Sequence, residues 1–151
     1  MKRIILLVIL TLVYSCGYTS VLKNKNQQDL IITIKNMEGD FQTNNFMKSQ
    51  LKLASNSNST NNFDLSIKSS YAKDTITRNT AGIATDFKIN INLEFTIISK
   101  NNLKVNYADS INVKNNSENF EETEYEREIK KNFAAATKDK LILYLLSLDD
   151  N

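Results

Sequence analysis

The sequence contains no histidine, no proline and no tryptophan, and its 151 residues include one cysteine and three glycines. Without histidine the chain lacks the commonest general base and the commonest metal ligand. One cysteine forms neither an internal disulfide bond nor a multi-cysteine zinc site, and three scattered glycines do not build a phosphate-binding loop. The sequence therefore predicts a protein that is not an enzyme and that holds no metal and no cofactor.

The composition is that of one folded domain. The length is typical of a single domain, and 41% apolar residues with six tyrosines and seven phenylalanines are enough to form a core. The formal charge of +2 falls to zero when Lys2 and Arg3 are left out. A neutral remainder with no basic stripe argues against a nucleic-acid partner.

Residues 1–15 have the layout of a secretory signal peptide, with Lys2 and Arg3 before an apolar run at 4–13. That run is too short to span a bilayer, which takes about 20 residues. Ser15 precedes the only cysteine, Cys16, and this arrangement resembles the bacterial lipobox. We therefore predict Cys16 as a lipid-attachment site carrying a diacylglycerol group and an N-acyl chain. The alternative is an ordinary signal peptide with an incidental cysteine.

The segment after the cleavage point is expected to link the lipid to the folded body. Residues 16–28 are mostly polar and lack periodicity, so we interpret them as a lipid-anchored tether and residues 29–151 as a single domain. By similarity to other bacterial lipoproteins, Gly17 in place of an aspartate favours export to the outer membrane. The expected location is the outer membrane, on its periplasmic side.

The domain is predicted to begin with a strand and a helix. Residues 29–35 are rich in β-branched side chains and precede a turn at 38–40, which predicts a strand. A helix is expected from Asp40 or Gln42, with Met47, Leu51 and Ala54 on its buried stripe and Leu53 beside them. Residues 55–62, which are only asparagine, serine and threonine, predict a solvated loop.

Three strands are expected to follow. Apolar and polar residues alternate at 63–71, again over 86–98, and again at 103–113 after asparagines that favour a tight hairpin. At about 3.3 Å per residue the middle strand extends roughly 40 Å. Strands with one apolar and one polar face are typical of antiparallel sheets, so the polar face must meet water or a polar partner.

A final helix is predicted over about residues 120–148. Acidic residues crowd its first turns, where the helix dipole favours anions, and Glu126 and Lys130 are spaced for an i, i+4 pair. Its apolar stripe indicates packing on the sheet, with a partner-binding helix as the alternative. The expected fold is α+β: a four-stranded, mostly antiparallel sheet with two helices on one face, in the order β-α-β-β-β-α.

Several stretches resemble the LptE family of lipopolysaccharide-assembly lipoproteins. Cys16-Gly17-Tyr18 closes the lipobox, and residues 46–53 (FMKSQLKL) are similar to the end of the first helix of that family. Residues 77–79 with the turn to Gly82 resemble its second hairpin, and residues 124–146 resemble its final helix. The similarity covers nearly the whole chain after the signal peptide.

The resemblance implies a lipoprotein that plugs a large β-barrel of the LptD type, assists its assembly and helps to deliver lipopolysaccharide to the outer leaflet. It also implies a lipopolysaccharide-binding role for Arg78, assisted by Lys73 at the same hairpin tip. Family members often carry another basic residue before the last helix, where this chain has Glu121 and Glu122 and where Lys114 is the nearest substitute.

Two other functions stay open from the residues alone. One is a generic periplasmic lipoprotein that binds another envelope complex or a hydrophobic ligand. The other is an enzyme with an unrecognised site.

Overall fold

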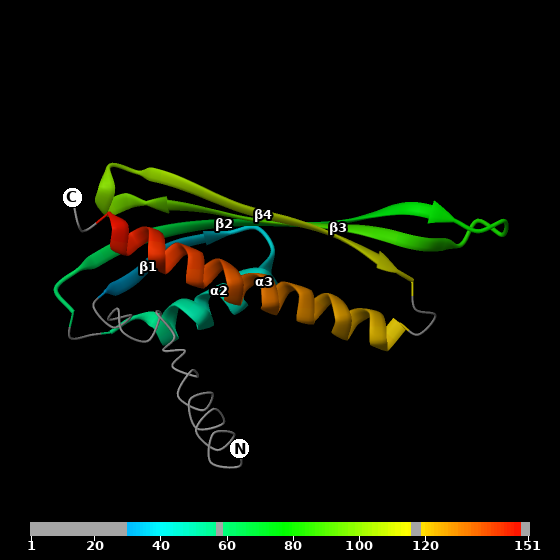
Figure 1. Ribbon diagram of the computed structural model, residues 1–151, viewed down its shortest axis with the longest axis horizontal. Helices are drawn as coiled ribbons and strands as arrows, with labels where there is room; N and C mark the ends of the chain where they lie inside the picture. Colours follow the sequence, from blue (N-terminus) through cyan, green and yellow to red (C-terminus); the bar gives the residue numbers. More distant parts are fainter. Residues whose placement is uncertain (1–29, 57–58, 116–118, 149–151) are drawn as a thin grey trace, which may run out of the picture.

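The computed structural model describes residues 30–56, 59–115 and 119–148, which form one sheet and two helices in two layers (Figure 1). The elements follow in the order β1 (Ile31–Glu38), α2 (Phe41–Ala54), β2 (Asn62–Arg78), β3 (Ala84–Ile97), the 3-10 helix η2 (Ile98–Lys100), β4 (Leu103–Lys114) and α3 (Asn119–Ser147). The strands lie in the order β1-β2-β3-β4; β1 is parallel to β2 and the other pairs are antiparallel. The predicted α+β class and element order are confirmed.

The connection from β1 to α2 follows local rules. Gly39 has a φ of 98°, a left-handed value that favours glycine, and the chain turns there. Asp40 caps α2, since its carboxylate accepts a hydrogen bond of 2.8 Å from the backbone N–H of Thr43. The predicted helix start is therefore correct.

The inward stripe of α2 differs from the prediction at one position. Met47 and Leu51 are buried, as expected, but Leu53 is 83% exposed. Leu53 lies two residues beyond Leu51, which turns it about 200° around the helix axis and away from the sheet. Leu53 is thus close to the buried stripe in sequence, but its side chain lies on the exposed face of the helix.

The hairpin of β2 and β3 is the longest feature of the sheet. Its pairing runs from Leu65 opposite Ile97 to Arg78 opposite Ala84, with register shifts between Thr75 and Arg78. The hairpin therefore reaches beyond the start of α3 as a ribbon (Figure 1). The sequence predicted β2 only as far as Tyr71, because the next inward position is Lys73, whose partners on α3 are carboxylates, so the apolar alternation ends there.

The turn between β3 and β4 confirms the predicted use of asparagine. Asn101 and Asn102 have φ values of 55° and 57°, which asparagine tolerates better than most residues. From this turn β4 pairs with β3 in an uninterrupted register, ending with Lys114 opposite Asp86.

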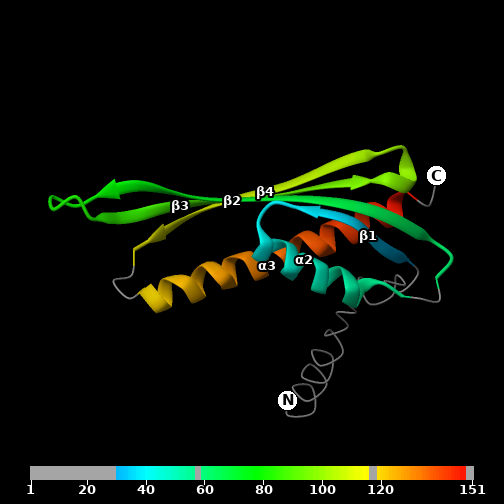
Figure 2. The same ribbon diagram turned by 180° about the vertical axis from the view of Figure 1, so that it is seen from behind.

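The apolar core occupies one half of the molecule. It is formed by the C-terminal half of α3, by α2 and by the adjoining halves of β2 and β3, and both helices lie on the same side of the sheet (Figure 2). The buried members are Leu30, Met47, Leu51, Phe63, Leu65, Ile67, Leu93, Phe95, Ile97, Ala134, Leu141, Ile142 and Leu145. The other half of α3 faces the sheet with both apolar residues, such as Ile129, and charged ones, such as Glu126 and Lys130.

The opposite face of the sheet is uncovered by either helix (Figures 1 and 2). Its centre is a shallow depression of about 460 Å³ with small and polar side chains, including Ser70, Ala72, Asn90, Asn92 and Ser110. This arrangement agrees with the predicted polar face that meets water or a polar partner.

Candidate functional site

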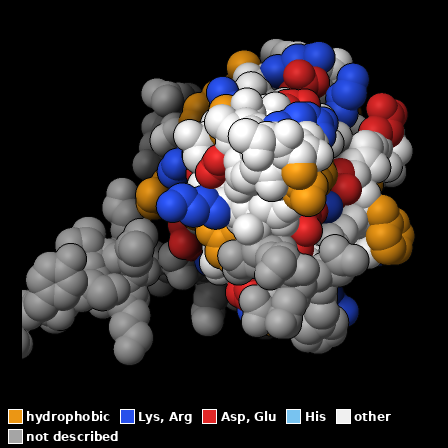
Figure 3. Space-filling view, turned by 90° about the vertical axis from the view of Figure 1, so that its right-hand side faces the viewer, with side chains coloured by type: hydrophobic (Ala, Val, Ile, Leu, Met, Phe, Trp, Pro, Cys, Tyr) orange, Lys and Arg blue, Asp and Glu red, His pale blue; other side chains and the backbone are white. Residues whose placement is uncertain are grey.

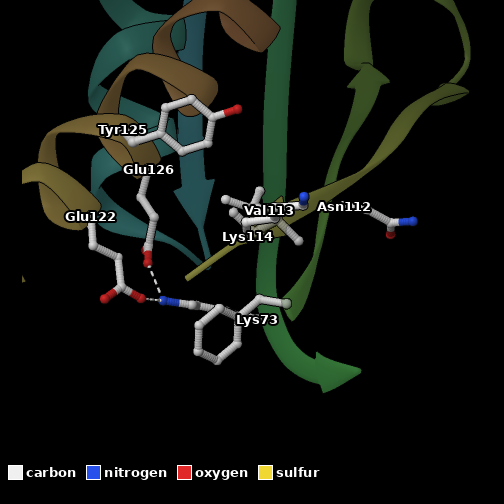
Figure 4. Close-up of a pocket in the computed structure, with 9 residues that line it drawn as sticks. Lys73, Asn112, Val113, Lys114, Glu122, Tyr125 and Glu126 are labelled. Atoms are coloured by element: carbon white, nitrogen blue, oxygen red, sulfur yellow. Dashed lines mark hydrogen bonds and ion pairs between the residues drawn. The ribbon is translucent and has the colours of Figure 1, made fainter. Parts of the chain in front are cut away.

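A cluster of charged residues joins β2 to the first half of α3. Lys73 donates a hydrogen bond of 2.7 Å to Oε1 of Glu126 and forms a second ion pair with Glu122 (Figure 4). The hydroxyl of Tyr71 donates to Oε2 of the same Glu126 at 2.6 Å. Tyr71 and Lys73 are therefore both tied to one helix through a single carboxylate.

A second ion pair extends the cluster to α2. The Nζ atom of Lys130 lies 3.1 Å from Oδ2 of Asp40 and 3.9 Å from the centre of the Tyr71 ring. Lys130 is 6% exposed, so its charge depends on these two contacts. Asp40, which also caps α2, thus connects both helices to β2.

The cluster shifts the pKa of both carboxylates in the same direction. Burial alone would raise the pKa of Asp40, but hydrogen bonds from Thr43 and Lys130 outweigh it and hold the pKa below its ordinary value. Burial likewise opposes the lowered pKa of Glu126, which results from the hydrogen bonds of Lys73 and Tyr71. Both carboxylates are therefore ionised at neutral pH.

The pKa values of Lys73 and Tyr71, the two partners of Glu126, are both raised. Burial would lower the pKa of Lys73, but its hydrogen bonds to Glu122 and Glu126 raise it. The pKa of the Tyr71 phenol is raised by burial and by the hydrogen bond to Glu126. Tyr71 therefore stays protonated and Lys73 stays charged.

A cavity of about 230 Å³ lies beside Lys73, between the start of α3 and the end of β4 (Figure 4). Its apolar lining includes Phe87, Ile89, Val113 and Tyr125. The Nζ atom of Lys73 lies 4.1 Å from the centre of the Phe87 ring. The cavity therefore combines apolar walls with a cation that two carboxylates already neutralise.

The predicted lipopolysaccharide-binding residues Arg78 and Lys73 lie apart. Arg78 is exposed at the tip of the β2–β3 hairpin, where Nη1 donates a hydrogen bond of 3.0 Å to the carbonyl oxygen of Gly82. Lys73 lies five residues earlier in β2, opposite Ile89, and its ammonium group faces α3. The predicted placement of Lys73 at the same tip is therefore wrong, because β2 continues as a strand to Arg78.

The hairpin tip has a mixed charge. Asp86 accepts hydrogen bonds from the hydroxyls of Thr77 and Thr85, and these lower its pKa. Lys114 lies opposite Asp86 at the end of β4. Seen from this end of the molecule, basic and acidic side chains alternate and apolar ones are scattered (Figure 3). Among the described residues, the exposed Arg78 thus lies on a hairpin that carries charges of both signs.

Other predictions concern residues outside the described part of the chain. Cys16, the signal peptide and the tether at 16–28 lie there, so lipidation stays a prediction. Within residues 30–56, 59–115 and 119–148, no group of three or more histidine, cysteine, aspartate or glutamate residues is placed to hold a metal ion. Among those same residues, neither helix has the length and apolar character needed to cross a membrane.

The Tyr71–Lys73–Glu126 cluster was not recognised in the sequence, although a signal for it exists. Continuing the alternation that starts at Phe63 places Tyr71 and Lys73 on the inward face of β2. An inward lysine requires a buried anion, and the acidic start of the final helix supplies one. The sequence instead suggested a pair between Glu126 and Lys130; in the structure Glu126 pairs with Lys73, and Lys130 pairs with Asp40.

Solved structures with a similar fold include lipoproteins. The chain is similar to the crystal structure of rare lipoprotein B from Shewanella oneidensis, with a TM-score of 0.58 and 12% identity, over 81% of this chain and 96% of that one. It is also similar to a crystal structure described as a lipoprotein from Caulobacter crescentus, with a TM-score of 0.51 and 14% identity, over 76% and 88% of the two chains. At such identities the likeness concerns the fold.

No protein-family model matches the chain, and no curated protein matches its sequence.

Proposed function

We propose that this chain is a lipid-anchored lipoprotein of the outer membrane that plugs and assists the assembly of an LptD-type β-barrel and helps to deliver lipopolysaccharide. The observation that carries the proposal is the fold, which is similar to that of rare lipoprotein B over 96% of that chain. The lipobox-like sequence at Cys16 supports the anchor. The resemblance of the sequence to the LptE family supports the barrel partner.

The surface of the domain supports a binding role inside a polar lumen. The centre of the uncovered sheet face is lined with hydroxyl, amide and small side chains, and charges of both signs flank it, with Lys68 opposite Glu94. The chain after the signal peptide has no formal net charge. Barrel interiors are polar, so such a mixed polar face can be accommodated there. A lipid on Cys16 would hold the domain at the membrane without a spanning helix.

Arg78 is the residue that best suits a phosphate group of lipopolysaccharide. Its guanidinium is exposed at the hairpin tip and uses one donor, Nη1, on the Gly82 carbonyl. The planar group can offer other donors to a phosphate in a bidentate arrangement. Lys73 is neutralised by Glu122 and Glu126, so an assisting role for it requires those ion pairs to open.

Purification from the cell envelope tests the proposal. A C-terminally tagged full-length chain is extracted in mild detergent, and its intact mass and co-purifying proteins are determined. We expect acyl mass on Cys16 and a stoichiometric LptD-type barrel. A Cys16→Ser variant should lack the acyl mass and leave the membrane fraction. Capture of no barrel protein by the acylated chain would refute the plug function, and an unmodified Cys16 would refute the anchor.

A further inference from the structure

Strand β4 forms a long edge of the sheet, and its protection consists of charged side chains: Lys104, Asp109 and Lys114. Its twelve residues pair with β3 on one side, and no described strand pairs with its other side. Natural edge strands are usually protected by proline, bulges or inward charges. The chain contains no proline, and the β3–β4 register has no shift. Unpaired backbone groups along β4 are therefore available to an added strand.

The rest of the sheet offers less regular edges, since β1, the edge strand on the far side, has a register shift between Ile34 and Asn36. The pairing of β1 with β2 ends at Lys68, so β2 beyond that residue also has one described strand neighbour. That part of β2 has register shifts between Thr75 and Thr77 and between Thr77 and Arg78. Bulges of this kind disturb the spacing that an added strand requires. The edge of β4 is the better acceptor.

A groove runs along β4 on the side that faces α3. It has a volume of about 720 Å³, and Tyr125 also lines the adjoining cavity of about 230 Å³. Its apolar contributors are Tyr107 and Ile111 from β4 and Tyr125, Ile129 and Phe133 from α3. Between them the two spaces border residues 106–114, a length of about 30 Å for an extended chain.

Three charged side chains line this groove beside the apolar ones: Glu128 and Lys140 from α3, and Asp109 from β4. Asp109 pairs with the buried Ile91, which places it on the helix-facing side between Tyr107 and Ile111. Its Oδ1 accepts a hydrogen bond of 2.8 Å from the backbone N–H of Ser110, and no ion pair to it is found among the described residues. An added strand would place a side chain directly opposite each of Tyr107, Asp109 and Ile111.

We infer that β4 binds an extended segment of the protein partner as a fifth strand, with a lysine or arginine opposite Asp109 and apolar residues opposite Tyr107 and Ile111. This inference rests on the proposed function, because it names how the lipoprotein holds its partner. The edge supplies backbone hydrogen bonds, and the groove supplies the side-chain specificity. Asp109 would then disfavour pairing with an entirely apolar strand and favour a partner strand with a cationic residue opposite it.

Binding of short peptides tests the inference on the full-length chain, purified in mild detergent. The first probe is a nine-residue peptide that alternates threonine with valine and carries lysine at the central inward position. The second has glutamate there. We expect the lysine peptide to bind at least tenfold more tightly, with the preference reversed by Asp109→Lys. Asp74→Lys, an exposed change of equal charge on β2, should leave the preference unaltered.

Backbone methylation distinguishes strand addition from simple groove binding. A strand pairs through alternate amides, so N-methylation of one alternate set should abolish binding and methylation of the other should preserve it. Equal binding of the lysine and glutamate peptides, or equal effects of the two methylated sets, would overturn the inference.

Photo-crosslinking in cells identifies the natural occupant and separates this inference from the proposed function. A photoreactive residue at Ala108 should crosslink to an extended segment of the co-purified partner that carries the apolar-x-basic-x-apolar pattern. Crosslinks to residues 16–28 of the same chain, to a second copy, or to a segment without that pattern would overturn it. If the barrel co-purifies but Asp109→Lys does not weaken its capture, the strand inference fails and the plug function stands.

Discussion

Lys130 shows what a buried charge contributes to this domain. Its ammonium lies between the Asp40 carboxylate and the Tyr71 ring, and its side chain is 8% exposed. Lys131, the next residue, has a side chain that is 52% exposed and pairs with Glu128 on its own helix. These adjacent lysines therefore differ: Lys130 is buried and contacts residues of other elements, whereas Lys131 is exposed and pairs with a residue of its own helix.

We expect Lys130→Met to destabilise the domain by about 3 kcal/mol, because it leaves the partly buried Asp40 without its cation. Lys131→Met should change stability by about 0.5 kcal/mol or less, since surface pairs contribute little. Urea denaturation of both variants measures the difference. Equal losses would mean that the Lys130–Asp40 pair does not stabilise the interface.

Arg78 is proposed to bind a phosphate group of lipopolysaccharide, so its substitution should lower ligand affinity and leave the stability of the fold unchanged. We expect Arg78→Glu to weaken lipopolysaccharide binding about tenfold, the effect of losing a charge-assisted contact of roughly 1.5 kcal/mol. Thermal stability should stay nearly unchanged, because the side chain makes one exposed contact, with the Gly82 carbonyl. Binding is measured with purified lipopolysaccharide, and melting is followed by circular dichroism.

Arg127→Glu is the matched control for Arg78→Glu. Arg127 is also exposed and carries the same charge, but it lies on α3 beside Glu124. If both variants lose affinity equally, the effect reflects net charge and the assignment of a site at Arg78 is wrong.

At the scale of elements, the β1–α2 connection depends on a glycine for two separate reasons. Gly39 has a left-handed φ, and a Cβ atom there would lie 1.8 Å from the carbonyl oxygen of Ser69. Gly82, in the β2–β3 turn, also has a left-handed φ of 79°, but a Cβ atom there would meet open space. An alanine would therefore have a strained backbone conformation at either position, but of the two only the alanine at position 39 would clash with Ser69.

Alanine at these two glycines separates strain from clash. We expect Gly82→Ala to cost about 1 kcal/mol, the usual penalty for a left-handed alanine. Gly39→Ala should cost at least about 3 kcal/mol, because β1, α2 and β2 must also move apart. Chemical denaturation of the two variants provides the comparison. Similar losses would indicate that the β1–α2 connection is free to shift away from β2.

The sequence was sufficient to predict the elements but not all of their partners. Alternation over 86–98 and 103–113 located β3 and β4, and the apolar spacing of Met47 and Leu51 located α2, because these patterns depend on one buried face. Parallel pairing of β1 with β2 was not predicted. It depends on a crossover through α2, which the residues of β1 do not encode on their own.

Of the two predicted binding residues, the sequence placed correctly only Arg78, whose position depends on a local turn. Arg78 was expected at a hairpin tip and lies there, and Lys73 was assigned to that tip because the end of β2 was placed too early. Its contact with Glu126 joins positions 53 residues apart in the chain. Periodicity indicates that Lys73 faces inward and needs an anion, but which carboxylate meets it depends on how α3 lies across the sheet.

The whole molecule has two halves that are held together by different forces. The C-terminal half of α3 packs on the sheet through apolar residues such as Leu141 and Leu145. The preceding half is joined to β2 and α2 through ion pairs of Glu126 and Lys130. Apolar burial hardly depends on pH, whereas ion pairs do. Acid should therefore loosen one half of the molecule before the other.

The direction of the pKa shifts fixes the pH range of this effect. Asp40 and Glu126 have pKa values lowered from ordinary values of 3.8 and 4.5, so as the pH falls the unfolded chain binds these protons first. Their contribution to stability is complete above about pH 5.5 and is lost as the pH falls through about 4 and below. We expect hydrogen-exchange protection of residues 124–131 to fall between pH 6 and pH 3.5, while residues 141–148 keep theirs.

A double variant, Asp40→Asn with Glu126→Gln, supplies the control, because it keeps similar shapes and removes both titrating groups. Its residues 124–131 should exchange at pH 6 about as fast, relative to intrinsic rates, as those of the unaltered chain at pH 3.5, with little further change in acid. Uniform loss of protection along α3 in the unaltered chain would contradict the division into halves, since it would mean that the helix opens as one unit. Selective loss in 124–131 that persists in the double variant would instead locate the acid-sensitive groups elsewhere.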